Sequence, residues 1–404
     1  MSENRSEAED RSDQATTGVT SPKGFVASGV ACGIKGSGDP DLALVATDDG
    51  RPVAAAAVFT SNLATAAPVQ ASRDHLVATG GQAAAVVLNS GNANAATGAT
   101  GRLHAGLMCE AVATGLGCRS AEVLVCSTGL IGIPLPIDAV AGGIEPLLAA
   151  RRADGGPEAA RAILTTDTVA KEVVVEGDGF TVGGMAKGAA MLAPNMATML
   201  AVLTTDAAAE PGELRAALAA AVESSFNRLT VDGCTSTNDT VIALAGGRAA
   251  APVAPGALAD ALAQACGSLA AQMAADAEGA TKVVQVRVQG APSEAEALQA
   301  ARKVAQSQLV KCSLYGADPY WGRILSELGS AGVAFDPDLV SIAYGGTVVC
   351  RGGVASAHDE AAVAAHLARR HVEVLAHLGL GDSGAVVLTN DLTPGYIDEN
   401  MRTS

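Results

Sequence analysis

The apolar and polar positions of this 404-residue chain fall into short segments that predict alternating strands and helices. Short apolar runs bounded by Gly, Asp, Asn or Pro are typical of buried strands. Such runs occupy residues 43–47, 53–59, 83–88, 122–126, 283–288 and 384–388. A β-hairpin is expected over residues 340–350, where two further runs flank Gly345 and Gly346.

Longer segments with apolar residues at every third or fourth position predict helices between these strands. The clearest contains Leu258, Leu262, Cys266, Leu269 and Met273. Their spacings of four, four, three and four place all the side chains on one helical face, so we expect Met273 to be a core residue. Further helices are predicted over residues 103–115, 136–152, 159–164, 213–224 and 294–307.

The last predicted helix begins at Ser356, with Asp359 three residues later in a capping-box arrangement. Four of the six His residues (358, 366, 371 and 377) then fall on that helix. Their spacings spread the imidazole rings around the helix axis, unlike the i, i+4 pair of a helical metal site. The sequence therefore predicts no metal site.

Composition limits how these elements can pack. Apolar residues make up 49% of the chain but aromatic residues only 2%, so Ala, Val, Leu and Gly must fill the core. A length of 404 residues exceeds what one hydrophobic core normally supports, which predicts two or more lobes. Residues 1–22 are rich in Ser, Glu, Asp and Thr and offer almost nothing to bury, so we expect a disordered tail.

Charge and cysteine usage indicate the compartment. The net charge of −16 argues against nucleic acid or an anionic membrane as a partner, because both attract basic patches. No segment has the apolar stretch of a signal peptide or of a membrane span. The eight Cys residues include no CxxC pair, which indicates reduced thiols rather than disulfides or a zinc site. These features predict a soluble, cytoplasmic protein.

The candidate chemistry is centred on residues 187–200, KGAAMLAPNMATML. A Gly-rich approach leads to an apolar run, and Thr198 follows the small residue Ala197 at the junction. An Ala-Thr bond in a tight turn suits self-cleavage, in which the Thr hydroxyl attacks the Ala197 carbonyl and water releases a new N-terminal Thr. Its amine, with an ordinary pKa of about 8, could then act as base for its own hydroxyl. The residue types alone leave open that Thr198 is an ordinary strand residue after a turn.

Other positions carry residues suited to acyl transfer. Gly129, directly after a predicted strand, can turn its N–H toward a developing oxyanion, although any Gly at a strand end has the same freedom. Thr165 and Thr166 could bind the polar ends of an amino acid or simply form a helix cap. Lys187 could bind a carboxylate, and Glu278 lies just past a helix. The plain alternatives for these two are a surface lysine and a solvated helix end.

Six sequence words occur in an order that resembles the ornithine acetyltransferase family, the self-processing glutamate N-acetyltransferases of arginine biosynthesis. The likeness runs from about Gly24 to the C-terminus. It implies an α/β fold, a layered α-β-β-α sandwich with mixed sheets, of the self-processing N-terminal-nucleophile type that aminopeptidases share. The words are NSGNANAATG (89–98), CSTGLIG (126–132), TTDT (165–168), KGAAMLAPNMATML (187–200), DGCTSTNDT (232–240) and DPYWGRI (318–324).

The resemblance also implies a function. Self-cleavage between Ala197 and Thr198 would give an alpha chain, 23–197 after the tail at 1–22, and a beta chain, 198–404. The assembly would contain two copies of each chain. Thr198 would take the acetyl group from N2-acetyl-L-ornithine and pass it to L-glutamate in a ping-pong reaction without a cofactor. Some members also accept acetyl-CoA as donor, and the sequence leaves open whether this chain does.

Individual residues receive roles from the same resemblance. Thr128 and Gly129 match the oxyanion hole of the family, and Thr198 matches its nucleophile. The residues that match substrate contacts are Thr165 or Thr166, Lys187, Thr198, Glu278, Asn400 and Ser404.

Three places depart from the family pattern. Cys234 stands where Asp is usual and Tyr320 where Asn is common, and the tail ends one residue early with different residues at 401–402. Asn400 matches cleanly, whereas Ser404 matches only loosely. The departures keep open a specialised-metabolism acetyltransferase of the same family. Two further alternatives are an N-terminal-nucleophile aminopeptidase or amidase, in which water takes the acyl group, and a non-catalytic binding module.

Overall fold

Two stacked β-sheets form the larger lobe of the protein. A computed structural model of the whole protein describes residues 18–193 and 199–401. The first sheet has four strands in the order β1-β2-β5-β6. Its strands are β1 (Phe25–Val30), β2 (Leu42–Thr47), β5 (Ala85–Asn89) and β6 (Val123–Ser127). The pairs β1–β2 and β2–β5 are antiparallel, whereas β5 and β6 are parallel. Helix α2 (Gly98–Leu116) makes the crossover that parallel neighbours require.

The second sheet has six strands in the order β4-β3-β10-β9-β8-β7. It is also mixed, because β9 and β10 are parallel while the other neighbours are antiparallel. Its strands are β3 (Val53–Phe59), β4 (Gln82–Ala83), β7 (Lys171–Glu176), β8 (Thr181–Lys187), β9 (Leu200–Thr205) and β10 (Thr240–Ala245).

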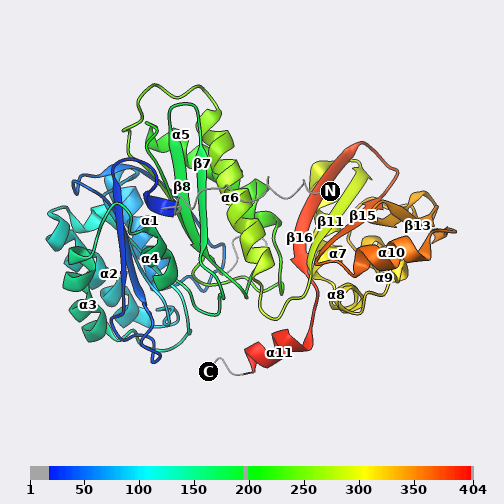
Figure 1. The fold of residues 1–404 in the computed structure, drawn as a ribbon, viewed down its shortest axis with the longest axis horizontal. Helices are drawn as coiled ribbons and strands as arrows, with labels where there is room; N and C mark the ends of the chain where they lie inside the picture. Colours follow the sequence, from blue (N-terminus) through cyan, green and yellow to red (C-terminus); the bar gives the residue numbers. More distant parts are fainter. Residues whose placement is uncertain (1–17, 194–198, 402–404) are drawn as a thin grey trace, which may run out of the picture.

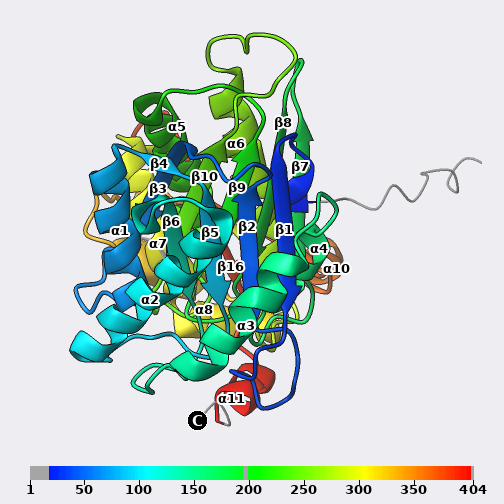
Figure 2. The ribbon, with the colours of Figure 1, turned by 90° about the vertical axis from the view of Figure 1, so that its left-hand side faces the viewer.

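Helices cover the outer face of each sheet, so the larger lobe is an α-β-β-α sandwich. Helices α1 (Ala67–Thr79), α2 and α3 (Ile137–Ala149) lie on the first sheet, and α5 (Pro211–Ser224) and α6 (Ala257–Ala275) lie on the second. Figure 1 shows these layers from left to right, and Figure 2 looks onto the layer of α1, α2 and α3. The expected α/β sandwich with mixed sheets is confirmed.

Small aliphatic side chains fill the space between the two sheets. Val45 and Leu88 of the first sheet belong to one buried cluster with Val202 and Ile242 of the second. Helix α4 (Gly156–Ala162) adds three buried Ala residues to the same cluster. The composition predicted this kind of core, and among the described residues Phe25 is the one aromatic side chain buried in this cluster.

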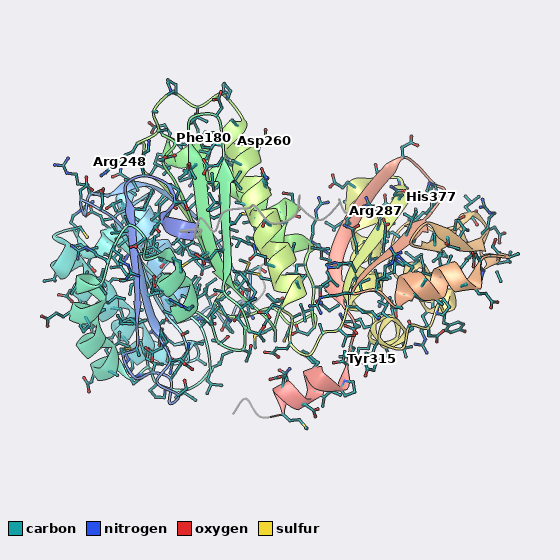
Figure 3. All side chains as sticks on the ribbon, viewed as in Figure 1. Phe180, Arg248, Asp260, Arg287, Tyr315 and His377 are labelled. Carbon is teal, nitrogen blue, oxygen red and sulfur yellow. The ribbon has the colours of Figure 1, made fainter. Side chains whose placement is uncertain are left out.

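A smaller lobe contains the third sheet, whose order is β14-β13-β12-β15-β11-β16. Its helices share one buried cluster with one face of the sheet, while the other face carries half-exposed side chains such as Arg287, ion-paired to Glu373 at 3.2 Å (Figure 3). The strands are β11 (Val283–Ala291), β12 (Ser341–Tyr344), β13 (Thr347–Arg351), β14 (Val354–Ala355), β15 (His371–His377) and β16 (Ser383–Asn390); the helices are α7 (Glu294–Gln306), α8 (Gln308–Tyr315), α9 (Trp321–Gly329) and α10 (Glu360–Leu367).

Short elements complete the described chain. Helix α11 (Pro394–Asn400) follows β16 and lies apart from the smaller lobe, below both lobes in Figure 1. The 3₁₀ turns are η1 (Gly18–Thr20), η2 (Ser120–Glu122), η3 (Phe226–Arg228) and η4 (Pro337–Leu339). Among the described residues, no helix combines the length and the apolar character needed to cross a membrane.

The predicted disordered tail, residues 1–22, is too long at its C-terminal end. Val19 is fully buried in the core between the sheets, and its carbonyl accepts a hydrogen bond from Thr204 Oγ1. The prediction failed here because a single apolar residue in a polar segment can still occupy a site on a sheet. Residues 1–17 lie outside the described part of the chain.

Two local predictions were wrong. The expected strand at 83–88 is divided at Ala84, where the chain passes from β4 in the second sheet to β5 in the first. The expected last helix, with four histidines, ends at Leu367, and Asp359 caps it by accepting from the Ala362 N–H. His371 and His377 are instead the first and last residues of strand β15, because the sequence between them alternates buried and more exposed positions with the period of a strand.

Candidate active site

A cavity of about 580 Å³ opens in the larger lobe beside helix α11. Thr128 and Gly129 follow the end of strand β6 and lie in the cavity wall, and strand β8 ends there with Lys187. The predicted site residues that line the cavity are Thr128, Gly129, Thr165, Thr166, Lys187, Glu278 and Asn400. The structure therefore brings together side chains that lie more than a hundred residues apart in the sequence.

Lys187 connects three of these positions. Its side chain is almost fully buried, and Nζ donates to Thr165 Oγ1 at 2.7 Å and to Thr128 Oγ1 at 3.4 Å. The Asp167 Oδ2 atom lies 3.6 Å from the same nitrogen. A buried ammonium needs such compensation, because burial without a partner charge is costly. Lys187 thus presents a positive charge to the cavity next to the candidate oxyanion pair.

Asp167 is a site residue that sequence reasoning passed over. It is buried and also binds Lys171 Nζ at 2.7 Å and the Gly188 N–H at 2.6 Å. Burial alone would raise the pKa of this carboxyl, but the charges of Lys187 and Lys171 outweigh it and hold the pKa of Asp167 well below its usual value. The available signal was its place in the TTDT word, directly after the two candidate hydroxyls.

The Thr128–Gly129 turn has a backbone that only glycine fits. Gly129 has a φ of +132°, and a Cβ built on it would lie 2.3 Å from the carbonyl carbon of Gly91. The Thr128 N–H donates a hydrogen bond to the Asn89 carbonyl at 2.9 Å. Within residues 18–193 and 199–401, the Gly129 N–H has no hydrogen-bond acceptor, although it lies in the cavity wall. This is the geometry expected of a donor for negative charge that develops in a reaction.

The two candidate threonines differ in their surroundings. Both line the cavity, but Thr165 is half-buried and accepts the hydrogen bond from Lys187, whereas Thr166 is exposed. Thr165 is therefore the one whose hydroxyl is held in place by a neighbour.

Residues from the C-terminal segment close one side of the cavity. Asn400 Nδ2 donates to the buried carboxylate of Glu278 at 2.8 Å, and the Tyr396 hydroxyl donates to Asp232 Oδ2 at 3.3 Å. Gly279, with a φ of +62°, lets the chain beyond Glu278 pass close to helix α11, since a Cβ there would lie 2.2 Å from Tyr396 N. Sequence reasoning predicted Asn400 and Glu278 and missed the second pair.

Asp239 is a further buried acid, and it contacts the residue that follows the candidate nucleophile in the chain. It is fully buried and accepts a hydrogen bond from the Met199 N–H at 2.9 Å. Burial raises the pKa of this carboxyl well above its ordinary value. Among the described residues, its Oδ2 atom has no hydrogen-bond partner. Because Met199 directly follows Thr198, Asp239 fixes the backbone at the first described residue of the predicted beta chain.

Three predicted positions, Ala197, Thr198 and Ser404, lie outside the described residues. The flanks of the first two are described. Lys187 and Leu200 are paired neighbours on the antiparallel strands β8 and β9, so the connection between these strands contains Ala197 and Thr198. On that connection Met191 lines the cavity with a left-handed φ of +55°, which is uncommon for a residue other than Gly, and its N–H donates to Asp232.

The first two of the three departures from the family pattern, Cys234 and Tyr320, are in different surroundings. Cys234 is exposed and lines the cavity beside Asp232, whose carboxylate accepts its N–H at 3.0 Å. Tyr320 is exposed on the smaller lobe, where Arg323 lies over its ring at 5.6 Å, and it lines a different, smaller hollow. Cys234 is therefore the departure that a ligand in the main cavity would meet. No cluster of His, Cys, Asp and Glu suited to a metal ion occurs among the described residues.

One cavity wall of this sandwich fold carries the buried Lys187, the Thr128 hydroxyl and the Gly129 N–H, which has no acceptor among the described residues. These groups are suited to the class of acyl-transfer enzymes. A family model described as the ArgJ family matches residues 26–403, so the chain belongs to the ArgJ family and is an acetyltransferase. This family contains the ornithine acetyltransferases that the sequence words resemble.

Named relatives agree with this assignment. The chain is 47% identical over 386 residues to the arginine biosynthesis bifunctional protein ArgJ of Thermobifida fusca, covering 96% of this chain and 99% of that one. It is 48% identical over 395 residues to the protein of the same name from Mycobacterium tuberculosis, with 96% of each chain covered. A solved chain of ornithine acetyltransferase complexed with ornithine, from Mycobacterium tuberculosis, is 49% identical with a TM-score of 0.42, covering 44% of this chain and 94% of that one.

Proposed function

We propose that the chain cleaves itself between Ala197 and Thr198 and that Thr198 then carries an acetyl group from N2-acetyl-L-ornithine to L-glutamate. The observation that carries the proposal is the position of Thr128, Gly129 and Lys187 in one cavity wall, beside the connection that contains Thr198. Membership of a family whose named relatives are bifunctional proteins of arginine biosynthesis supports these substrates.

Cleavage in this proposal has two steps. The Thr198 hydroxyl oxygen attacks the carbonyl carbon of Ala197, the C–N bond of the peptide breaks, and the acyl group passes to oxygen as an ester. Water then hydrolyses the ester, which leaves the Ala197 carboxylate and returns a hydroxyl and a free amine to Thr198. Asp239 supports this reaction by holding the Met199 N–H, so the backbone on the departing side keeps its position.

Acetyl transfer reuses the same hydroxyl. Thr198 Oγ1 attacks the acetyl carbonyl of acetylornithine while its own amine accepts the hydroxyl proton, and the Gly129 N–H and Thr128 stabilise the oxyanion. The C–N bond breaks, the proton passes to the leaving amine, and ornithine departs. The neutral α-amine of glutamate then attacks the acetyl-Thr ester, its proton returns to Thr198 Oγ1, and N-acetylglutamate is released.

The charges of the cavity fit these substrates. Lys187, 3.4 Å from Thr128 Oγ1, is placed for the α-carboxylate, which lies one carbon from the reacting nitrogen. Glu278, buried and held by Asn400, offers a negative charge to the side-chain ammonium of ornithine. Thr165 and Ser404 are included as further substrate contacts. No cofactor takes part in the proposed reaction.

We assign the residues up to Ala197, with the buried Val19 among them, to the alpha chain and residues 198–404 to the beta chain, and we include a pair of each in the working assembly. Both chains contribute to the second sheet, where the adjacent strands β10 and β9 of the beta chain lie between β3 and β8 of the alpha chain. This shared sheet supports a stable alpha–beta unit. Native mass spectrometry tests the assembly: two copies of each chain are expected, and a single pair would contradict it.

Mass spectrometry of the acetyl-enzyme tests the transfer mechanism. With N2-acetyl-L-ornithine alone, the beta chain should gain the mass of one acetyl group on Thr198, and adding L-glutamate should remove it and yield N-acetylglutamate. The same experiment with acetyl-CoA shows whether it is a second donor. Loss of the acetyl group to water alone, with no N-acetylglutamate, would contradict transfer and favour an amidase.

A further inference from the structure

One cation of the cavity has no part in the mechanism described so far. Lys35 lies in the loop between β1 and β2 and lines the cavity together with Lys187. It is half-buried, and its Nζ donates to the Pro40 carbonyl at 2.8 Å. No carboxylate lies within ion-pair distance of Lys35 in the described part of the chain, whereas Lys187 has Asp167.

The loop backbone holds the carboxylate of Asp41, which acts on the charge of Lys35 but forms no ion pair with it among the described residues. Asp41 is fully buried, and its carboxylate accepts four backbone N–H groups, from residues 32 to 35, at 2.6–3.1 Å. Those hydrogen bonds use the lone pairs of both oxygens and fix the path of the loop. The Lys35 backbone is thereby held in place while its ammonium keeps capacity for another anion.

The stem of Lys35 also lies next to the oxyanion turn. A Cβ built on Gly91 would be 3.1 Å from Lys35 Cγ, and a Cβ on Gly129 would be 2.3 Å from the Gly91 carbonyl carbon. The three residues are therefore stacked in contact, with Gly91 in the middle. Because Lys35 and Gly129 also line the same cavity, Lys35 is within the reach of a small amino acid whose nitrogen reacts with an acetyl group beside Gly129.

The proposed donor and acceptor differ in charge at one end. Both carry an α-carboxylate, but the side chain of ornithine ends in an ammonium and that of glutamate in a carboxylate. A single cavity that accepts both therefore needs an anion for one and a cation for the other. Lys187 is placed for the shared α-carboxylate and Glu278 for the ammonium, and Lys35 is the remaining cation among the described residues that line the cavity.

We infer that Lys35 binds the side-chain carboxylate of the acetyl acceptor and so selects a dicarboxylic amino acid in the second half-reaction. This inference rests on the proposed function and adds a residue that determines acceptor specificity. It involves no covalent step: the ammonium of Lys35 donates hydrogen bonds to the carboxylate and leaves the chemistry to Thr198.

Steady-state kinetics with two acceptors tests the inference. In a ping-pong reaction, kcat/KM for each substrate reports its own half-reaction. Lys35→Met keeps an unbranched stem against Gly91 and removes the charge. We expect kcat/KM for L-glutamate to fall about tenfold or more, whereas kcat/KM for acetylornithine stays near the wild-type value. The preference for L-glutamate over L-glutamine should fall by the same factor, and Lys35→Arg should restore most of it.

A matched control and two contrary outcomes complete the test. Lys303→Met, on helix α7 and ion-paired to Glu327, removes a lysine far from the cavity and should leave both kcat/KM values unchanged. An unchanged glutamate-to-glutamine preference in Lys35→Met, with exchange intact in the wild type, would overturn the inference and leave the proposed function standing. Absence of exchange in the wild type would overturn both.

Discussion

A single buried carboxylate, Asp167, serves two lysines with different tasks. Lys171 is fully buried and binds both Asp167 at 2.7 Å and Asp276 at 2.6 Å. Lys187 shares Asp167 but faces the cavity, where a ligand carboxylate can complete its environment. The network therefore separates a structural cation from a substrate-binding one, although both lie on neighbouring strands of the same sheet.

Substituting each lysine should separate these tasks. Lys171→Met removes the lysine partner of Asp276 and one of the two lysine partners of Asp167. It should therefore destabilise the fold by about 3–5 kcal/mol. Lys187→Met should lower kcat/KM for acetylornithine about ten- to hundredfold while costing less stability. Urea denaturation and initial rates at a temperature where both variants are folded provide the two readouts. Equal losses of activity in the two folded variants would contradict the separation.

Asp239 should make stability depend on pH in a definite direction. Its folded-state pKa is raised by burial, whereas the unfolded value is about 3.9. The folded state therefore binds the proton more tightly, and stability falls as pH rises from about 4 through the raised pKa. Asp239→Asn keeps an acceptor for Met199 N–H and lacks this titration.

The measurement is urea unfolding between about pH 4 and pH 8, with both proteins in the Thr198→Ala background so that neither is cut. The free energy of unfolding of Asp239→Asn minus that of the parent should increase with pH. Parallel curves would show that Asp239 titrates alike in the folded and unfolded states.

At this scale, the sequence words predicted Lys187, Thr128, Gly129, Glu278 and Asn400 as residues of one site, and the structure gathers them in one cavity. They did not reveal the acids at 167, 232 and 239. Acidic residues in polar loops are ordinarily solvated, and only the packing around them shows that Asp167 and Asp239 are buried and that Asp232 is half-buried.

Helix α11 is the element whose structure depends most on the rest of the protein. Its seven residues are too few to be a stable helix alone, and none of them is buried. Thr393 caps it, and Tyr396 and Asn400 fix it to Asp232 and Glu278 across the cavity. We therefore expect α11 to act on substrate binding rather than on folding.

Removing the contacts of α11 should affect KM before it affects stability. Asn400→Ala leaves the Glu278 carboxylate without its amide donor, and we expect KM for acetylornithine to rise several-fold, by roughly the worth of one hydrogen bond to a charged group. Ile397→Ala, at an exposed position on the same helix, is the control and should behave as wild type. The idea fails if Asn400→Ala lowers the thermal midpoint while its KM stays unchanged.

The hydrophobic pattern predicted an element correctly where it continued over many residues. It failed where tertiary structure decides which element forms. The stripe from Leu258 to Met273 falls within α6, and the hairpin around Gly345 and Gly346 is present. The division at Ala84 could not be predicted, because an apolar run does not show that two sheets share it. The capping signal at Asp359 predicts where helix α10 begins but not that it ends at Leu367, and the alternation from His371 to His377 is that of a strand.

On the scale of the whole molecule, the proposed cut does not coincide with the division into lobes. Residues before Ala197 and after Thr198 build the sandwich together, since β3 and β8 pair with β10 and β9. The smaller lobe belongs entirely to the second half of the chain. The sequence predicted two lobes but not that the C-terminal helix returns from the smaller lobe to the cavity of the larger one.

The two chains should accordingly stay together after cleavage. Separation would expose the edges of β8, β9, β3 and β10 and the apolar faces of the core between the sheets, which water disfavours strongly. On native size exclusion, the cut protein should elute at the volume of the uncut Thr198→Ala variant, and two bands should appear only on a denaturing gel. Elution of separate halves would contradict the shared-sheet argument.

The most direct test of the central claim is the intact mass of the purified protein under denaturing conditions, beside Thr198→Ala. Self-cleavage predicts two fragments in the wild type that meet at Ala197 and Thr198, and one uncut chain of 39.9 kDa in the variant. A single 39.9 kDa chain in both proteins would contradict self-processing and, with it, the assignment of Thr198 as an N-terminal nucleophile.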